Sequence, residues 1–324
     1  MQLLKRLLLA AAWAFGIVGG AATFSAQAWP ARPIRVTVPW PAGGNADVTI
    51  RPILDRMAQH LGQSIVVENR AGGNNIVGAQ AAAKMPADGY NYFFATTAAT
   101  VINLYTMKSL PYDPLKDFDP LTILGRAPVF MMANPKLGPK TAQEFVALCK
   151  KEPGKINFGS GSASTRISGE LLKAKAGIDM VHVPYKSTPL ALQDTMSGHV
   201  QMCFTDPVTG LPQVKAGTVL CLGVGSRGRY KLTPEIPPLI EQGIPDFELM
   251  TWTGVLMPKG VPQPILAKLH EAIVKTITEP SYVARQAQGG SEIAPCSPEE
   301  MRRIQVAEIE LYREMMKVAG IEPE

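Results

Sequence analysis

Two copies of one local pattern constrain the fold of this 324-residue chain more than any other feature. In each copy an apolar, β-branched strand leads into a loop of small residues, and a helical apolar pattern follows directly. The first copy occupies residues 34–61 and the second residues 155–174. Strands that alternate with helices over short turns predict an α/β fold with largely parallel sheets.

The first 28 residues have the composition of an export signal. Lys5 and Arg6 precede an apolar run, residues 7–18, and the segment ends in Ala26-Gln27-Ala28, a small-residue cleavage pattern. The apolar run is short for a membrane span, so we expect a cleaved signal peptide, residues 1–28, rather than a retained anchor. The sequence therefore predicts a protein secreted into the periplasm.

The 296 residues that remain (324 minus 28) exceed what one hydrophobic core usually supports. Two extended apolar segments, residues 121–133 and 247–257, are suited to crossing between two lobes. We therefore predict a discontinuous first lobe, residues 29–126 plus 254–324, and a second lobe, residues 127–253. Each lobe is expected to be a mostly parallel sheet flanked by helices.

The two small-residue loops form the predicted binding site. Ligands of open α/β sheets bind at the carboxyl ends of strands, and each loop opens into a helix whose N-terminal N–H groups and dipole favour an anion. Asp47 is expected to be the N-cap of the first helix. The candidates are Pro41, Ala42, Gly43, Gly44, Asn45 and Asp47 in the first loop and Ser160, Ser162, Ser164 and Thr165 in the second.

Two side chains beside these loops bear on the kind of ligand. Arg166 follows the second loop, and its guanidinium suits bidentate recognition of a carboxylate. Trp40 borders the first loop and offers a flat apolar face. Together they favour a dicarboxylate with an apolar spacer, of which terephthalate is an aromatic example. The alternative, which the sequence leaves open, has Arg166 solvated and Trp40 buried in its lobe.

Other classes of function receive little support. The basic residues are scattered, so we predict no nucleic-acid partner. Residues 223–228 satisfy G-x-G-x-x-G, but a proline-rich segment follows where a nucleotide site needs a helix. The histidines lack metal-ligand spacing and no nucleophile motif occurs, so we predict no catalytic residue, no metal and no cofactor. The widely spaced cysteines predict no structural disulfide.

Several segments of the mature chain resemble the Bug (TctC-like) solute receptors of tripartite tricarboxylate transporters. The matching segments follow the family's order from the first mature residues to the last. They are residues 30–36 (PARPIRV), 38–44 (VPWPAGG), 66–70 (VVENR), 87–90 (ADGY), 181–186 (VHVPYK), 214–217 (VKAG) and 318–321 (VAGI).

The resemblance implies a two-lobed periplasmic binding protein, a Venus flytrap of the type II-like class. It implies a monomer that holds a small carboxylate at both loops and delivers it to integral-membrane transporter subunits. Thr97, Tyr185 and Asp206 complete the predicted ligand-binding set. Three positions depart from the family pattern: Trp40 replaces the usual Phe, Thr205 precedes Asp206 where Asp-Asn is common, and Arg166 replaces a small or polar residue.

Two other functions use the same scaffold. A sensory subunit that presents its closed form to a membrane kinase has the same pocket and a different partner surface. A periplasmic hydrolase or isomerase needs a nucleophile and a base, and the sequence offers no such pair. The transport receptor is the leading prediction.

Overall fold

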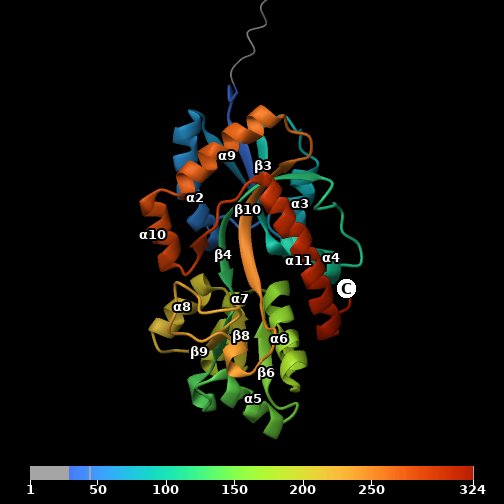
Figure 1. Cartoon of the computed structure of the whole chain (residues 1–324), viewed down its shortest axis with the longest axis vertical. Coiled ribbons are helices and arrows are strands. Elements are labelled where there is room, and N and C mark those ends of the chain that lie inside the picture. The colour runs from blue at the N-terminus through green and yellow to red at the C-terminus, as the bar shows by residue number, and fades with distance from the viewer. Residues whose placement is uncertain (1–28, 44, 324) are drawn as a thin grey trace, which may run out of the picture.

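The computed structural model of the chain describes residues 29–43 and 45–323. These residues form two lobes, each built on its own sheet, which lie one above the other in Figure 1. The predicted two-lobed α/β architecture is confirmed. The predicted signal peptide and Gly44 lie outside the described residues. Within the described part, no helix combines the length and apolar character that a membrane crossing needs.

The first lobe contains the sheet with strand order β11-β4-β10-β3-β1-β2. Strand β1 pairs in parallel with β2 and β3, whereas β10 pairs antiparallel with β3 and β4. The sheet is therefore mixed: the expected parallel pairing is found among β1, β2 and β3, whereas β10, β4 and β11 pair antiparallel. The strands are β1 (Ile34–Val38), β2 (Ile65–Asn69), β3 (Asn91–Thr96), β4 (Phe118–Pro128), β10 (Met250–Pro258) and β11 (Glu292–Ile293).

Helices cover both faces of this sheet. Ile53, Met57 and Leu61 of α2 recur at helical spacing and are buried against Phe94 and α9. On the opposite face, α3 and the start of α11 pack against β3 and β10. The helices are α2 (Asn45–Leu61), α3 (Ile76–Ala83), α4 (Asn103–Thr106), α9 (Gln263–Ile277), α10 (Pro280–Gln288) and α11 (Pro298–Ala319), with short helical segments at Gly73–Asn75 and Ala98–Ile102.

The second lobe contains the sheet with strand order β7-β6-β8-β5-β9. Strand β6 pairs in parallel with β7 and β8, and β5 lies antiparallel between β8 and β9. The strands are β5 (Phe130–Ala133), β6 (Asn157–Ser160), β7 (Val181–Pro184), β8 (Met202–Thr205) and β9 (Leu220–Val224). The helices are α5 (Ala142–Lys151), α6 (Ala163–Ala176), α7 (Thr188–Ser197) and α8 (Pro207–Lys215), with helical turns at Pro135–Leu137 and Ile240–Gln242.

Two strands carry the chain between the lobes. β4 runs into β5 through Val129, and β10 begins directly after Leu249. The two passages are joined, because Val129 N donates a hydrogen bond to Leu249 O at 3.1 Å. The predicted lobe limits, after residues 126 and 253, fall inside β4 and β10, which pair on both sides of those limits with a register shift between Thr253 and Gly254. Those limits stay a prediction.

Helix α11 contacts both lobes. Met301, near its start, packs in the core of the first lobe. Tyr312, Met315 and Met316, near its end, pack in the core of the second lobe with residues such as Phe158. Figure 1 shows the helix running beside β10 and down to α6. The helix expected to complete the first lobe therefore also covers the second.

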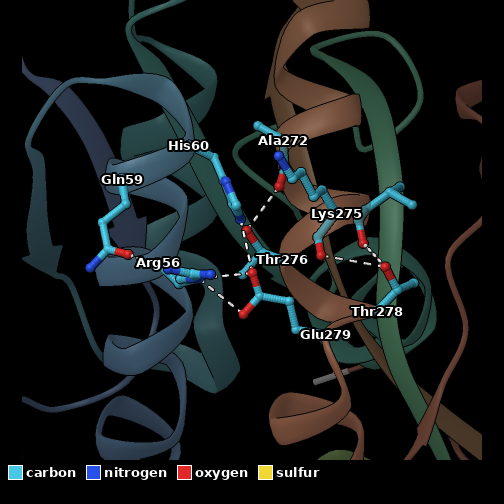
Figure 2. Close-up of polar contacts among 9 residues, drawn as sticks. Arg56, Gln59, His60, Ala272, Lys275, Thr276, Thr278 and Glu279 are labelled. Atoms are coloured by element: carbon cyan, nitrogen blue, oxygen red, sulfur yellow. Dashed lines mark hydrogen bonds and ion pairs between the residues drawn. The ribbon is translucent and has the colours of Figure 1, made fainter.

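A polar cluster fixes α2 to the junction of α9 and α10 (Figure 2). Glu279 accepts two hydrogen bonds from Arg56 Nε, at 2.8 and 3.0 Å, and lies 3.0 Å from His60 Nε2. The hydrogen bond from Arg56 lowers the pKa of Glu279, so the carboxylate stays ionised. Because Glu279 immediately precedes α10, this cluster ties the start of α10 to α2.

Candidate functional site

A cavity of about 360 Å³ lies between the lobes. Most of its apolar wall comes from the first lobe, with Pro207 and Val208 of α8 added from the second, and the polar side chains come from both lobes. It is lined by Trp40, Ile50, Ile53, Asn74, Asn75, Phe94, Thr96, Thr97, Ala98, Ile102, Gly125, Arg126, Ala127, Ser162, Ser164, Asp206, Pro207, Val208, Thr209, Thr251, Trp252, Thr253, Tyr282, Gln286 and Ser291.

Trp40 belongs both to the cavity wall and to the core of its lobe. Its ring meets Phe94 edge-on, with centroids 5.9 Å apart and planes at 65°. Its carbonyl accepts a hydrogen bond from Asn69 Nδ2 at 3.0 Å. The two interpretations left open by the sequence are therefore both partly met, because one face of the ring packs inward while the residue still lines the cavity.

The carboxylate of Asp47 is hydrogen-bonded to the backbone of the first loop. The cap prediction is wrong, because α2 begins at Asn45 and places Asp47 inside its first turn. The buried carboxylate accepts hydrogen bonds from Gly43 N at 2.9 Å, Arg51 Nε at 2.8 Å and Asn69 Nδ2 at 2.8 Å. Burial raises the pKa of Asp47, but the hydrogen bonds from Arg51, Asn69 and Gly43 outweigh it and lower that pKa overall.

Pro41, Ala42 and Gly43, on the turn between β1 and α2, are exposed and are not part of the cavity lining. Gly44 and the side chain of Asn45 lie outside the described part of the chain. Trp40 before the turn and Ile50 after it line the cavity. The carboxylate of Asp47 accepts a hydrogen bond from Gly43 N and so ties the turn to its own helix.

The residues of the second loop have two roles: some cap helix α6, and some line the cavity. Ser162 is the N-cap of α6 and forms a capping box with Thr165, whose hydroxyl accepts from Ser162 N at 3.1 Å. Ser162 and Ser164 line the cavity, whereas Thr165 is buried in the cap. Ser160 is also buried and lies 2.7 Å from His182 Nε2, outside the cavity lining. The hydroxyls of Ser160 and Thr165, which were predicted as ligand donors, therefore both have hydrogen-bond partners in the protein.

Gly161 permits the close approach that closes this loop. A Cβ at this position would lie 1.9 Å from the carbonyl carbon of Ser187. The segment before α7 therefore passes against the loop backbone at a distance that only glycine allows.

Arg166 lies outside the cavity lining. It follows the cavity-lining Ser162 by one helical turn, and its backbone N donates to Ser162 O at 3.0 Å. Tyr185 is also outside the cavity lining, and its hydroxyl donates to Asp194 Oδ2 at 2.8 Å. Ligand contacts from these two residues stay a prediction.

Asp206 and Thr97 do line the cavity, and each also has a structural role. Asp206 is the N-cap of α8 and accepts from Thr209 N and Thr209 Oγ1, both at 2.8 Å. Thr97 Oγ1 accepts from Trp252 N at 2.8 Å and so ties the end of β3 to the returning strand β10. These two residues place the first turn of α8 and the wall of β10 at the same cavity.

A pair of asparagines was missed by sequence reasoning. Asn74 and Asn75 line the cavity from the loop after β2, with φ of +51° and +74°. Asn75 Nδ2 donates to Thr96 Oγ1 at 2.9 Å, and Asn74 Nδ2 donates to Asn103 Oδ1 at 2.7 Å. The Gly/Asn-rich composition of this loop was the available signal, because asparagine tolerates the left-handed backbone region.

The crossing strands and α10 supply the other missed residues. Arg126 lies on β4 at the cavity and is exposed, and among the described residues its guanidinium has no hydrogen-bond or ion-pair partner within 4 Å. It is also the cationic residue of the described lining. Tyr282 and Gln286 face the cavity from α10, where Gln286 Nε2 donates to Tyr282 Oη at 2.8 Å.

Residues 49–320 match the profile of the tripartite tricarboxylate transporter family receptors, TctC. The chain belongs to this family. The TctC receptor BugT of Bordetella pertussis is 30% identical over 305 residues, which are 93% of this chain and 94% of that protein. TctC and Bug proteins are solute-binding receptors, so this chain is a binding protein and not an enzyme.

Solved structures of TctC-like proteins share the fold. Rpa4515 of Rhodopseudomonas palustris, solved with adipate, superposes with a TM-score of 0.85 at 29% identity and covers 91% of this chain and 100% of that one. MatC of the same organism, solved with bound malate, superposes with a TM-score of 0.79 at 27% identity and covers 89% of this chain and 99% of that one. Two proteins solved with carboxylates are thus similar to this chain along nearly its whole length.

The chemistry of the TctC cavity suits an anion with an apolar body. Arg126 supplies a positive charge, and Ser162, Ser164, Asn74 and Asn75 supply uncharged donors. Trp40, Phe94, Ile53 and Tyr282 supply apolar surface.

Proposed function

We propose that this receptor captures a small dicarboxylate between its lobes and delivers it from the periplasm to the membrane subunits of a tripartite tricarboxylate-type transporter. The observation that supports the ligand class is the cavity itself. It combines the exposed cation Arg126, donor side chains from both lobes and an apolar wall. A ligand that contacts all three has charged ends and an apolar middle.

Two relatives support the charge of the ligand. Adipate and malate, found with the two structurally similar proteins, are both dicarboxylates. In this chain the carboxylate partner that we propose is Arg126 rather than Arg166, because only Arg126 is in the cavity lining. A guanidinium can bind a carboxylate through two parallel hydrogen bonds.

The apolar wall supports a spacer with little polarity. Trp40 and Phe94 form an aromatic corner, and Tyr282 faces the same cavity from α10. A saturated chain such as that of adipate or a ring such as that of terephthalate can bury apolar surface there, at about 25 cal/mol per Å². Further ligand contacts that we propose come from Thr97, Ser162, Ser164 and Asp206.

The family and the N-terminal sequence support the proposed export and delivery. Residues 1–28 carry the signal-peptide pattern, and the similar protein BugD is a periplasmic binding protein. We propose that the closed receptor presents both lobes to the transporter as a monomer. The sensory alternative uses the same pocket and differs only in the membrane partner.

A thermal-shift screen of the mature chain against mono-, di- and tricarboxylates tests the ligand class. A ligand present at 100 times its Kd stabilises the folded state by about 2.7 kcal/mol, which is readily measured. We expect dicarboxylates with apolar spacers to raise Tm more than the matching monocarboxylates. A screen in which no carboxylate raises Tm would contradict the proposal. Uptake of the best ligand by cells with and without the gene then separates transport from sensing.

A further inference from the structure

Glu308, in the middle of α11, is hydrogen-bonded to a side chain of the cavity wall. Trp252 Nε1 donates to Glu308 Oε2 at 2.6 Å. Trp252 lies on β10 and lines the cavity, and its backbone is held by Thr97. The contact therefore joins the long C-terminal helix to the strand that connects the lobes.

This contact lies between the two cores. Seven residues before Glu308, Met301 packs in the first lobe; four residues after it, Tyr312 packs in the second. Figure 1 shows α11 beside β10 along the passage from one lobe to the other. A change in the angle between the lobes must alter how α11 packs on β10, because each end of the helix is buried in a different core.

The surroundings of Glu308 place the ionisation of its carboxyl group near neutral pH. Burial raises the pKa of Glu308 to about 7, although the Trp252 indole and the positive charge of Arg126 favour the ionised form. Burial raises the pKa of Tyr312, and the negative charge of Glu308 raises it further. The charged and titratable residues on elements packed against α11 are Arg126 and Asp119 on β4, Tyr105 on α4, and Arg166, Glu170, Lys173 and Lys175 on α6, while the segment Ala98–Ile102 carries none.

We propose that Glu308 is a proton-dependent hinge residue: its neutral form keeps α11 and the Trp252 wall packed with the lobes together, and its ionised form favours lobe separation. The physical cause is hydration, since an ionised carboxylate is costly to bury and gains free energy from any conformation that admits water. Opening along α11 and β10 admits water at this position. The inference rests on the proposed capture function, because lobe closure is the step that it regulates.

The same proton also changes the charge next to Arg126. Ionised Glu308 attracts the guanidinium that we propose for the ligand carboxylate, and neutral Glu308 does not. The effect on lobe closure and the effect on the charge beside Arg126 both favour anion binding when Glu308 is neutral. Capture of an anion is therefore expected to be favoured as the pH falls through 7.

Indole NMR of the ligand-free mature chain tests the proton-binding step. The mature sequence has three tryptophans, Trp29, Trp40 and Trp252, and the variants Trp29→Phe and Trp40→Phe assign their signals by elimination. Between pH 5.5 and 8.5 we expect the Trp252 Nε1–H signal to shift with a midpoint near 7. Glu308→Gln should abolish that titration. Glu310→Gln, an exposed position on the same helix, should leave it unchanged.

Small-angle scattering of the same samples tests the conformational step. The radius of gyration of the wild-type chain should be larger at pH 8.5 than at pH 6, and that of Glu308→Gln should be equal at both. The glutamine variant separates the contribution of Glu308 from that of other groups in the chain. A Trp252 signal without titration, a titration that persists in Glu308→Gln, or an unchanged radius would overturn the proposal. Neither readout uses a ligand, so a failed carboxylate screen leaves both intact.

Discussion

The phenol of Tyr230, in the second lobe, donates a hydrogen bond to the carbonyl oxygen of Gly290, in the first lobe, at 2.9 Å. The same oxygen of Tyr230 accepts from Glu292 N at 3.1 Å. Gly290 has a φ of +73°, and a Cβ there would lie 2.7 Å from Leu211 and Pro207 of α8. The turn after α10 therefore packs against α8 and Tyr230 of the second lobe.

Tyr230→Phe should loosen this contact between the lobes. The change removes one hydroxyl and leaves the partly buried Glu292 N and Gly290 O without their partner, at a cost of about 1–3 kcal/mol. We expect weaker binding of the best dicarboxylate through faster dissociation, measured by stopped-flow Trp fluorescence. Tyr282→Phe, which changes a phenol on α10, is the control for a general effect on the cavity. An unchanged dissociation rate would show that the Tyr230 contact plays no part in closure.

Arg126→Gln should weaken binding of a dicarboxylate by about 10- to 100-fold, because a hydrogen bond to a charged group contributes about 1.5–3 kcal/mol. Arg166→Gln is the matched control, since Arg166 lies outside the cavity lining. Isothermal titration of both variants with adipate or terephthalate measures the difference. Equal losses in the two variants would assign the effect to net charge instead of to contact with the ligand.

Asp47→Ala should destabilise the fold by about 1–3 kcal/mol, because Gly43 N and Asn69 lose a buried acceptor. The folded-state pKa of Asp47 is lowered, so its stabilisation is present above the unfolded value, near 4, and is lost as the pH falls through the folded value. Urea unfolding at pH 7 and pH 3 measures both effects. A difference between wild type and variant that is as large at pH 3 as at pH 7 contradicts the ionised-acceptor role.

Glu308→Gln should stabilise the protein above neutral pH. The folded-state pKa of Glu308 is raised from 4.5 to about 7, so its contribution is most favourable below 4.5 and is lost as the pH rises through 7. At 1.36 kcal/mol per pKa unit, the ionised side chain costs the folded state about 3 kcal/mol at high pH. Urea unfolding at pH 5.5 and 8.5 should show the gain mainly at 8.5. A variant that is less stable than wild type at pH 8.5 rules this out.

Short-range patterns predicted the elements that carry the site. The alternating apolar residues of β1 predicted Ile34–Val38, and the helical spacing of Ile53 and Met57 predicted the buried face of α2. The small-residue loop before α6 was predicted as part of the site, and its Ser162 and Ser164 line the cavity. These features depend on neighbours a few residues apart, so the sequence contains their cause.

Helical phase alone does not decide whether Arg166 reaches the cavity. It follows the cavity-lining Ser162 by one turn of α6, yet it lies outside the lining, so its place depends on tertiary packing. The Asp47 prediction failed because α2 begins at Asn45, which makes Asp47 an acceptor for Gly43 inside the first turn. A shift of two residues at the helix start changed the role of that side chain.

The sequence alone determined the family, the two-lobed α/β fold and the loops around which a ligand binds. Only the tertiary structure decided that Arg126, Trp252 and Tyr282 share one cavity, since they lie on two crossing strands and a helix that are up to 156 residues apart (282 minus 126). It also decided the environment of Glu308. Burial and long-range packing set the charge of that residue, and no local pattern along α11 records either of them.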